Sequence, residues 1–151
     1  MKRPTANTWQ FAQGLVAREA KGNKSSINKS KAPLVFGAVV DKLRQPLIIL
    51  AGTLVFRSLL SRALALAIDE VRWLRAVHVK ADGTLEGPAE MARFDQKEIA
   101  HAEAVLITQL LGLLLTFIGE ALTLRLLQDV WPAALVNDFY SSRKDSKREE
   151  T

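Results

Sequence analysis

Hydrophobic residues recur at helical spacing along two long stretches of the chain, residues 47–75 and residues 96–130. In the first stretch the polar residues return every three or four positions and form one stripe, whereas nearly all the others are apolar. The second stretch opens with Asp95 as a helix N-cap and Glu98 in the capping-box position, and Pro132 ends it. Two long helices joined by a short connection predict a mainly α fold built on an antiparallel helical hairpin.

Proline and glycine mark the expected interruptions of this pattern. A shorter helix is predicted over residues 34–44, and it should end by Gln45 because the residue before Pro46 avoids the helical conformation. Pro46 then fits the first turn of the next helix. Gly112 and Gly119 lie inside the second long stretch, where glycine is unfavourable, so we expect close packing or a kink at those points.

The connection between the two long helices alternates in polarity. Residues 76–80 and 84–86 flank the dipeptide Asp82-Gly83, a combination that favours a tight β-turn. Two strands this short are marginal alone, so they need support from the helices. The sequence therefore predicts a small β-hairpin or an extended turn at the tip of the helical hairpin.

The two ends of the chain are more polar than the body. Residues 1–33 form a basic arm with seven Lys or Arg residues against one acidic residue, and residues 139–151 form a second charged tail. Both segments contain too little apolar surface to offset the entropy of ordering, so we expect them to be largely disordered. The chain therefore divides into the arm, a helical domain over residues 34–138, and the tail.

One part of the basic arm has helical spacing. A short amphipathic helix is expected within residues 8–20, ahead of a disordered segment over residues 21–32. The apolar positions of this helix are Trp9, Phe11, Leu15 and Val16. A helix of this kind either docks on the body of its protein or lies on a membrane surface.

Composition excludes several classes of protein. The chain of 151 residues contains no cysteine, which excludes disulfide scaffolds, zinc–thiolate sites, iron–sulfur clusters and cysteine catalysis. The net charge of +5 comes from the ends of the chain, and a basic arm can contact phosphate groups. Because the arm lacks the interleaved aromatic residues that stack on bases, nucleic acid is not an expected partner except through nonspecific contact with the arm.

Residues 104–119 run for sixteen positions without a charge. Small or polar residues recur every three or four positions here and just beyond, at Thr108, Gly112, Thr116, Glu120 and Thr123, and form a narrow stripe. The rest of the circumference is almost entirely Leu, Ile, Val or Phe. A helix that is apolar nearly all round must be buried on several sides, and one partner helix covers only part of it. We therefore expect the flanks of this helix to be covered by the short preceding helix, a second copy, another protein or lipid.

Charged residues inside the helical pattern bear on how that surface is used. An unpaired carboxylate at Glu120, among apolar neighbours, would be costly, so Arg57 and Arg62 are its expected partners in an interior ion pair. A membrane span needs about 20 predominantly apolar residues, and charges interrupt both long helices before that length. This favours a water-soluble or peripheral helical assembly over a hairpin embedded in the membrane.

One pair of residues has a spacing known from metal chemistry. Glu98 and His101 lie three positions apart on one helical face, as in the Glu-x-x-His pairs of di-iron carboxylate bundles. Only one such pair occurs, Glu98 has a capping role of its own, and no phosphate-binding glycine loop or nucleophile elbow accompanies it. The sequence therefore leans against an enzyme and indicates no cofactor.

These features predict a non-enzymatic helical interaction module of the cytoplasm that forms a homo-oligomer or docks a partner protein through helix 96–130. The alternative hypothesis is a small membrane-associated helical-hairpin protein with its charges paired internally, and the third is a helical metal-binding protein or enzyme that uses Glu98 and His101. The residues expected at the interface or in its support are Leu110, Gly112, Leu114, Thr116, Phe117, Glu120, Arg57, Arg62 and Trp131.

Overall fold

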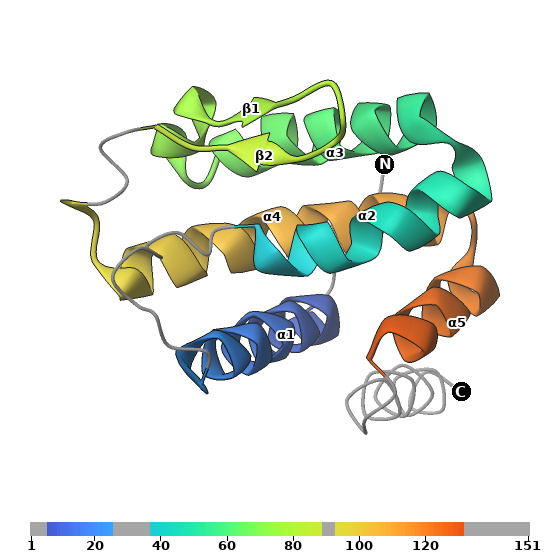
Figure 1. The fold of residues 1–151 in the computed structure, drawn as a ribbon, viewed down its shortest axis with the longest axis horizontal. Helices are drawn as coiled ribbons and strands as arrows, with labels where there is room; N and C mark the ends of the chain where they lie inside the picture. Colours follow the sequence, from blue (N-terminus) through green and yellow to red (C-terminus); the bar gives the residue numbers. More distant parts are fainter. Residues whose placement is uncertain (1–5, 26–36, 89–92, 132–151) are drawn as a thin grey trace.

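The computed structural model describes residues 6–25, 37–88 and 93–131, and this part of the chain is mainly helical, as predicted (Figure 1). One two-stranded antiparallel sheet accompanies the helices in these residues. The elements in chain order are α1 (Ala6–Ser25), α2 (Ala38–Ala51), α3 (Thr53–Ile68), the 3-10 helix η2 (Arg72–Ala76), β1 (His78–Val79), β2 (Leu85–Glu86), α4 (Gln96–Phe117) and α5 (Glu120–Val130).

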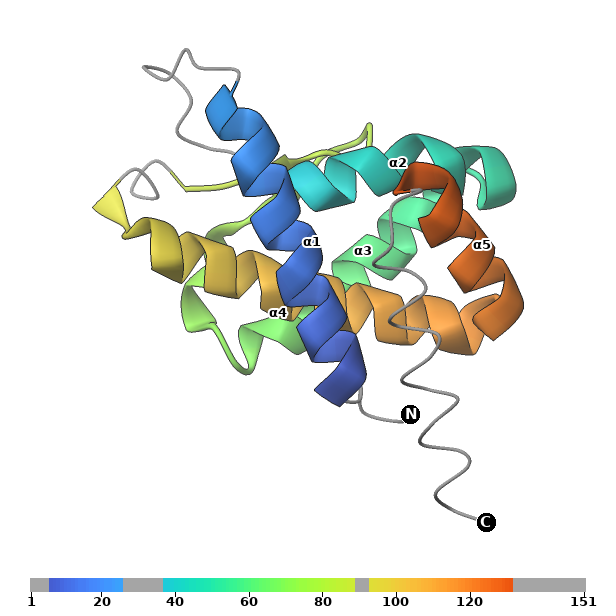
Figure 2. The same cartoon turned by 90° about the horizontal axis from the view of Figure 1, so that it is seen from below.

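Helix α4 lies at the centre of the fold. Helix α3 runs antiparallel along one side of it, and α1 crosses its other side (Figures 1 and 2). Leu106, Leu110 and Leu114 of α4 are completely buried, as are Leu15 of α1 and Leu60 of α3. Burial of one leucine side chain contributes about 1.5–3 kcal/mol. These three helices therefore form most of the core, and α2 and α5 pack around them.

The β-hairpin predicted between the long helices is confirmed. Strands β1 and β2 pair antiparallel, with His78 opposite Glu86 and Val79 opposite Leu85. The hairpin lies along the outer side of α3, and β1 contacts that helix (Figure 1). The helix thus supplies the support that two such short strands need.

The turn of the hairpin is held by Thr84. Its backbone N–H and its Oγ1 hydroxyl both donate hydrogen bonds to Oδ1 of Asp82, at 3.0 and 2.7 Å. These bonds, the side-chain bond foremost, hold the pKa of Asp82 below its ordinary value because they favour the charged carboxylate. The turn also rests on α3, since a Cβ atom added to Gly83 would lie 2.8 Å from Cε2 of the buried Phe56 ring.

The helix boundary predicted at Pro46 is wrong, because Pro46 lies inside α2. A proline within a helix removes a backbone hydrogen bond and costs about 3 kcal/mol. Helix α2 continues because its apolar face packs into the core on both sides of the proline, through Leu43 and Leu47. The chain leaves the helix only at Gly52, where φ is 96° and ψ is 159°, a conformation that is essentially limited to glycine.

The two long helical stretches are also interrupted. The stretch 47–75 contains the end of α2, all of α3 and most of η2. The stretch 96–130 is divided into α4 and α5 by Gly119, with φ of 89°. Gly112 remains inside α4. Where a kink was expected at the two glycines, the structure has a complete helix break at Gly119 and an uninterrupted helix at Gly112.

The helix expected in the basic arm is longer than predicted. α1 has 20 residues and includes residues 21–25, where disorder was expected. Its apolar positions Phe11, Leu15 and Val16 are buried, so α1 docks on the body of the protein. Tertiary packing supplies the stability that the polar sequence of this helix lacks. The rest of the expected disordered segment and the tail 139–151 lie outside the described residues.

Candidate docking surface at the apolar end

Two helix corners are built in the same way, around Gly52 and Gly119. The N–H of Gly52 donates a hydrogen bond to the carbonyl of Ile48 at 2.8 Å, and its own carbonyl accepts from Phe56 N–H at 3.1 Å. Gly52 therefore ends α2 and begins α3. The carbonyl of Gly119 likewise accepts the first bond of α5, from Thr123 N–H at 3.1 Å. At this second corner Ile118 ends α4, its N–H donating to the carbonyl of Leu114 at 2.9 Å, and in both corners a glycine with positive φ turns the chain into the next helix.

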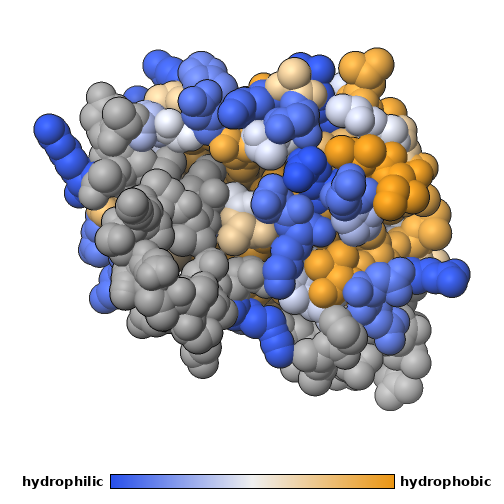
Figure 3. Space-filling model, viewed as in Figure 1, coloured by the Kyte–Doolittle hydropathy of each residue, from blue (hydrophilic) through white to orange (hydrophobic). Residues whose placement is uncertain are grey.

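Both corners lie at the same end of the molecule (Figures 1 and 2). The side chains around them are large, apolar and open to solvent: Ile49 is 81% exposed and Leu54 is 74% exposed. Hydrophobic residues accordingly gather at this end of the surface (Figure 3). We call this surface the apolar end, and define it by the large hydrophobic residues that are exposed in the described part of the chain, Ile49, Leu50, Leu54, Phe117 and Leu122.

The residues predicted at the interface are divided by the structure. Leu110, Leu114 and Trp131 are buried by their own chain, so they are core residues of one copy and a docked partner cannot reach them. Phe117 is exposed, as expected for an interface residue. The predicted surface along the flanks of α4 is therefore mostly covered by α1 and α3. The large apolar side chain of α4 that remains exposed, Phe117, lies at the end of the helix.

The small-residue stripe of α4 has a local structural role. Thr108 is buried and its Oγ1 donates to the carbonyl of Ala104 at 2.7 Å. Thr116 is exposed and its Oγ1 donates to the carbonyl of Gly112 at 3.1 Å. Each hydroxyl therefore has a hydrogen-bond acceptor in the preceding turn of its own helix. They need no partner from another chain.

The α2–α3 half of the apolar end was missed by the sequence analysis. Ile49, Leu50 and Leu54 were assigned to the first turns of one long, uninterrupted helix over residues 47–75, where apolar residues are expected to be buried. The signal that could have found them is Gly52, which stands between two apolar runs and permits a helix break. With a break there, the residues on either side lie at a corner instead of inside a helix.

The predicted interior ion pair is not formed within one copy. Glu120 is half-buried at the first position of α5, where a carboxylate is favourable next to the helix N-terminus. Arg62 is exposed and Arg57 is half-buried, and among the described residues neither forms an ion pair with Glu120. The Nε atom of Arg57 is buried and has no hydrogen-bond acceptor within that part of the chain.

Glu98 and His101 each have a structural contact. Oε1 of Glu98 accepts a hydrogen bond from Asp95 N–H at 3.2 Å, which confirms the capping box. The His101 ring is exposed and meets the Trp9 ring edge-on, with centroids 5.5 Å apart. Within the described ranges no group of three potential ligand side chains gathers around a common point that could hold a metal ion.

A buried carboxylate that the sequence analysis missed is Glu103 of α4, which is only 5% exposed. Its Oε2 accepts a hydrogen bond from the backbone N–H of Val39 at 3.1 Å. Helix α2 begins after Gly37, which has no side chain to cap it, so α4 supplies the cap through Glu103. The sequence signal was an acidic residue on the apolar face of the helix, between Ile99 and Leu106.

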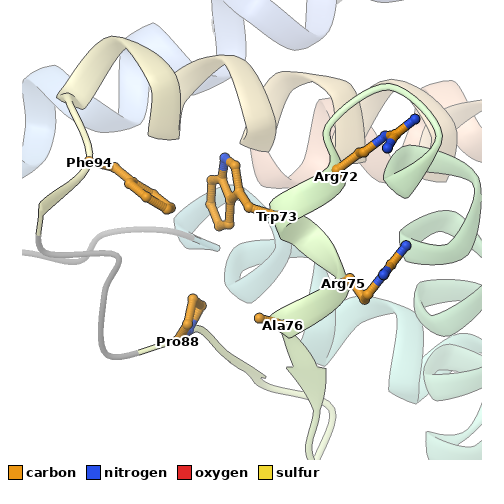
Figure 4. A pocket seen from close by; sticks show the side chains of 6 residues that line it. All are labelled: Arg72, Trp73, Arg75, Ala76, Pro88 and Phe94. Carbon is orange, nitrogen blue, oxygen red and sulfur yellow. The ribbon is translucent and has the colours of Figure 1, made fainter.

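An open cleft of about 550 Å³ lies between η2 and the start of α4. The Trp73 and Phe94 rings face each other there, with centroids 4.8 Å apart, whereas the Arg72 and Arg75 side chains extend away from them (Figure 4). The cleft is therefore apolar and holds no charged group directed into it. Its lining residues are Arg72, Trp73, Arg75, Ala76, Pro88 and Phe94.

In the described residues one helix, α4, is long and apolar enough to cross a membrane, but 67% of its most apolar window is buried inside the protein.

Comparison of the chain with known protein families, curated proteins and solved structures finds no match.

Proposed function

We propose that this protein is a non-enzymatic helical interaction module that docks through its apolar end. The observation that carries the proposal is the gathering of five large exposed hydrophobic side chains around the Gly52 and Gly119 corners. Complete burial of each such side chain would contribute about 1.5–3 kcal/mol. Contiguous apolar patches of this kind mark docking sites, whereas scattered exposed hydrophobic residues do not.

The position of the patch on the fold also supports docking. Its residues flank two corners whose helices are anchored in the core, through Leu47 and Phe56 on one side and Leu114 and Leu127 on the other. A surface fixed in this way needs little ordering when it binds, so less of the binding free energy is lost. The burial of α4 favours docking at the end over a hairpin that spans a membrane.

The proposal can be tested without knowing what covers the apolar end. Because the chain has no cysteine, a single variant Leu54→Cys reports on that surface alone. Ala65→Cys is the matched control, since Ala65 is exposed on the same face of α3, three turns and about 16 Å farther along. The measurement is the rate of labelling by a polymer-linked maleimide, in an extract of expressing cells and in dilute purified protein.

We expect Leu54→Cys to react at least about tenfold more slowly in the extract than after purification, because an occupant removes the thiol from water. Ala65→Cys should react at similar rates in both samples. Rates for Leu54→Cys that match those of Ala65→Cys in both samples would show that nothing covers the apolar end, and would refute the proposed function.

A further inference from the structure

We propose that the apolar end inserts into the surface of an anionic lipid bilayer, a conclusion that rests on the proposed docking function and names its occupant. Three observations support a membrane over another protein. They are the position of the corners at the outer edge of the fold, the limited area that they present, and the charges on the helices behind them.

The corners project into open space. A Cβ atom added to Gly52 or to Gly119 would meet no other atom within 4 Å, although both glycines lie where two helices join. The two corners lie at the outer edge of the ribbon and carry the most exposed large apolar side chains, so we call them the tips of the apolar end (Figure 1). A protein partner would need concave pockets that match both tips, whereas a bilayer adapts to any convex apolar shape.

The area of the apolar end is small for a stable protein interface. Such an interface buries about 800 Å² on each partner. Five partly exposed side chains present at most a few hundred Å², within the range of about 300–600 Å² that single apolar patches reach on monomeric proteins. A second copy docked on these residues alone would therefore form only a weak dimer.

The charges behind the apolar end complement anionic lipid. The helical segments on either side of the corners, residues 44–62 and 109–125, contain four arginines and one acidic residue, Glu120. Arg62 and Arg125 are exposed, so their guanidinium groups can reach lipid phosphates while the tips enter the apolar layer.

Arg57 adds a specific point of contact. It follows Leu54 by less than one helical turn, is half-buried, and its Nε has no acceptor in the described part of the chain. The Nε atom itself is closed to solvent, so a headgroup phosphate at the membrane surface would be bound by the terminal nitrogens of the same half-buried guanidinium group. The arrangement is that of a peripheral contact, with apolar tips below the headgroups and cations at their level.

The test measures binding of the full chain to sedimented vesicles of phosphatidylcholine, with and without about 30% phosphatidylserine. We expect the protein to bind the anionic vesicles and to bind phosphatidylcholine alone at least about tenfold more weakly. Added salt should weaken the binding to anionic vesicles because it screens the arginines.

Two double variants separate the apolar and the charged contributions. Leu54→Ser with Phe117→Ser should lower the partition coefficient for anionic vesicles at least about tenfold, because the tips no longer favour the apolar layer. Arg62→Gln with Arg125→Gln should lower it about tenfold and reduce the preference for anionic lipid. All four side chains are exposed, so both proteins should fold, and circular dichroism checks this. Ala65→Ser is the control and should bind as the unmodified chain does.

The basic arm could bind anionic vesicles without the apolar end. If Leu54→Ser with Phe117→Ser binds as tightly as the unmodified chain, another segment makes the contact and the inference is overturned. If no vesicle binds but light scattering detects a dimer that this variant abolishes, a second copy is the occupant, so the inference fails while the proposed function stands. If Leu54→Cys also labels at the rates of Ala65→Cys in both extract and purified protein, both proposals fail.

Discussion

Phe56 and Leu54 lie two residues apart near the start of α3, yet one is completely buried and the other is mostly in water. Phe56 lies under the turn of the β-hairpin, which covers the outer side of α3. Leu54 stands beside the Gly52 corner, where no described part of the chain covers it. The two residues are equally apolar in sequence, so their difference shows that coverage by distant segments, and not local pattern, separates core from docking surface.

The largest expected effect compares the core with the apolar end. Leu110→Ala, in the completely buried part of α4, should lower the free energy of unfolding by about 2–5 kcal/mol because it leaves a cavity. Leu54→Ala should change it by no more than about 0.5 kcal/mol, since the side chain makes few contacts. Urea denaturation followed by circular dichroism measures both values. A loss at Leu54 as large as that at Leu110 would show that the apolar end belongs to the core.

The side of α3 that the hairpin covers and the apolar end also differ in the space around their glycines. Gly83 and Gly52 both have φ near +90°, so alanine at either position should cost on the order of 1–3 kcal/mol in backbone strain. Gly83→Ala should cost about 1 kcal/mol more, because its Cβ would meet the Phe56 ring, whereas Gly52 has open space. The measurement is the free energy of unfolding of each variant.

A double-mutant cycle isolates that contact. Phe56→Leu shortens the side chain beneath Gly83, so it should recover part of the extra destabilisation of Gly83→Ala. When Phe56→Leu is combined with Gly52→Ala, the two losses in the free energy of unfolding should simply add. A coupling of equal size at both glycines would mean that the hairpin turn is not seated on Phe56 and would remove the contrast between the two sides.

A smaller effect is expected where α4 caps α2. Glu103→Leu leaves the backbone N–H of Val39 without its acceptor and should lower the free energy of unfolding by about 1–3 kcal/mol. Glu103→Gln keeps an oxygen acceptor and should lose less. Hydrogen exchange at the Val39 amide should accelerate in Glu103→Leu, whereas the exchange rates of amides at the apolar end should stay unchanged. Equal exchange rates for Val39 in both variants would contradict the capping role.

The features that sequence could predict are the local ones. Asp95 and Glu98, three positions apart, form the cap of α4, and Asp82 bonds to Thr84, two positions on, in the hairpin turn. Each of these features is determined by neighbours in the chain. The mainly α fold follows from apolar spacing in the same way. Pro46 shows the limit of this reasoning, since burial of the flanking residues overrides a local preference to end the helix.

The docking surface depends on long-range contacts and was only partly predictable. Phe117 belongs to the apolar end, but Leu110 and Leu114 of the same helix are covered by α1 and α3. No local pattern in the sequence indicates that a helix from the basic arm crosses α4. The sequence analysis therefore expected more of the α4 surface to be exposed than the structure shows. Glu103 was missed for the same reason, because its partner Val39 lies 64 positions away.

The smallest expected effect concerns the turn that covers α3. Because hydrogen bonds from Thr84 lower the pKa of Asp82, its charged form stabilises the folded hairpin. This contribution is present above the pKa that Asp82 has in the unfolded chain, and it is lost as the pH falls through the lower folded value. Thr84→Val removes the hydroxyl donor but keeps the backbone N–H, so it should raise the Asp82 pKa part of the way back, while Thr84→Ser should not. Titration of the Asp82 carboxyl by NMR in the three proteins measures this, and a pKa that stays unchanged in Thr84→Val would show that the hydroxyl bond does not hold the turn.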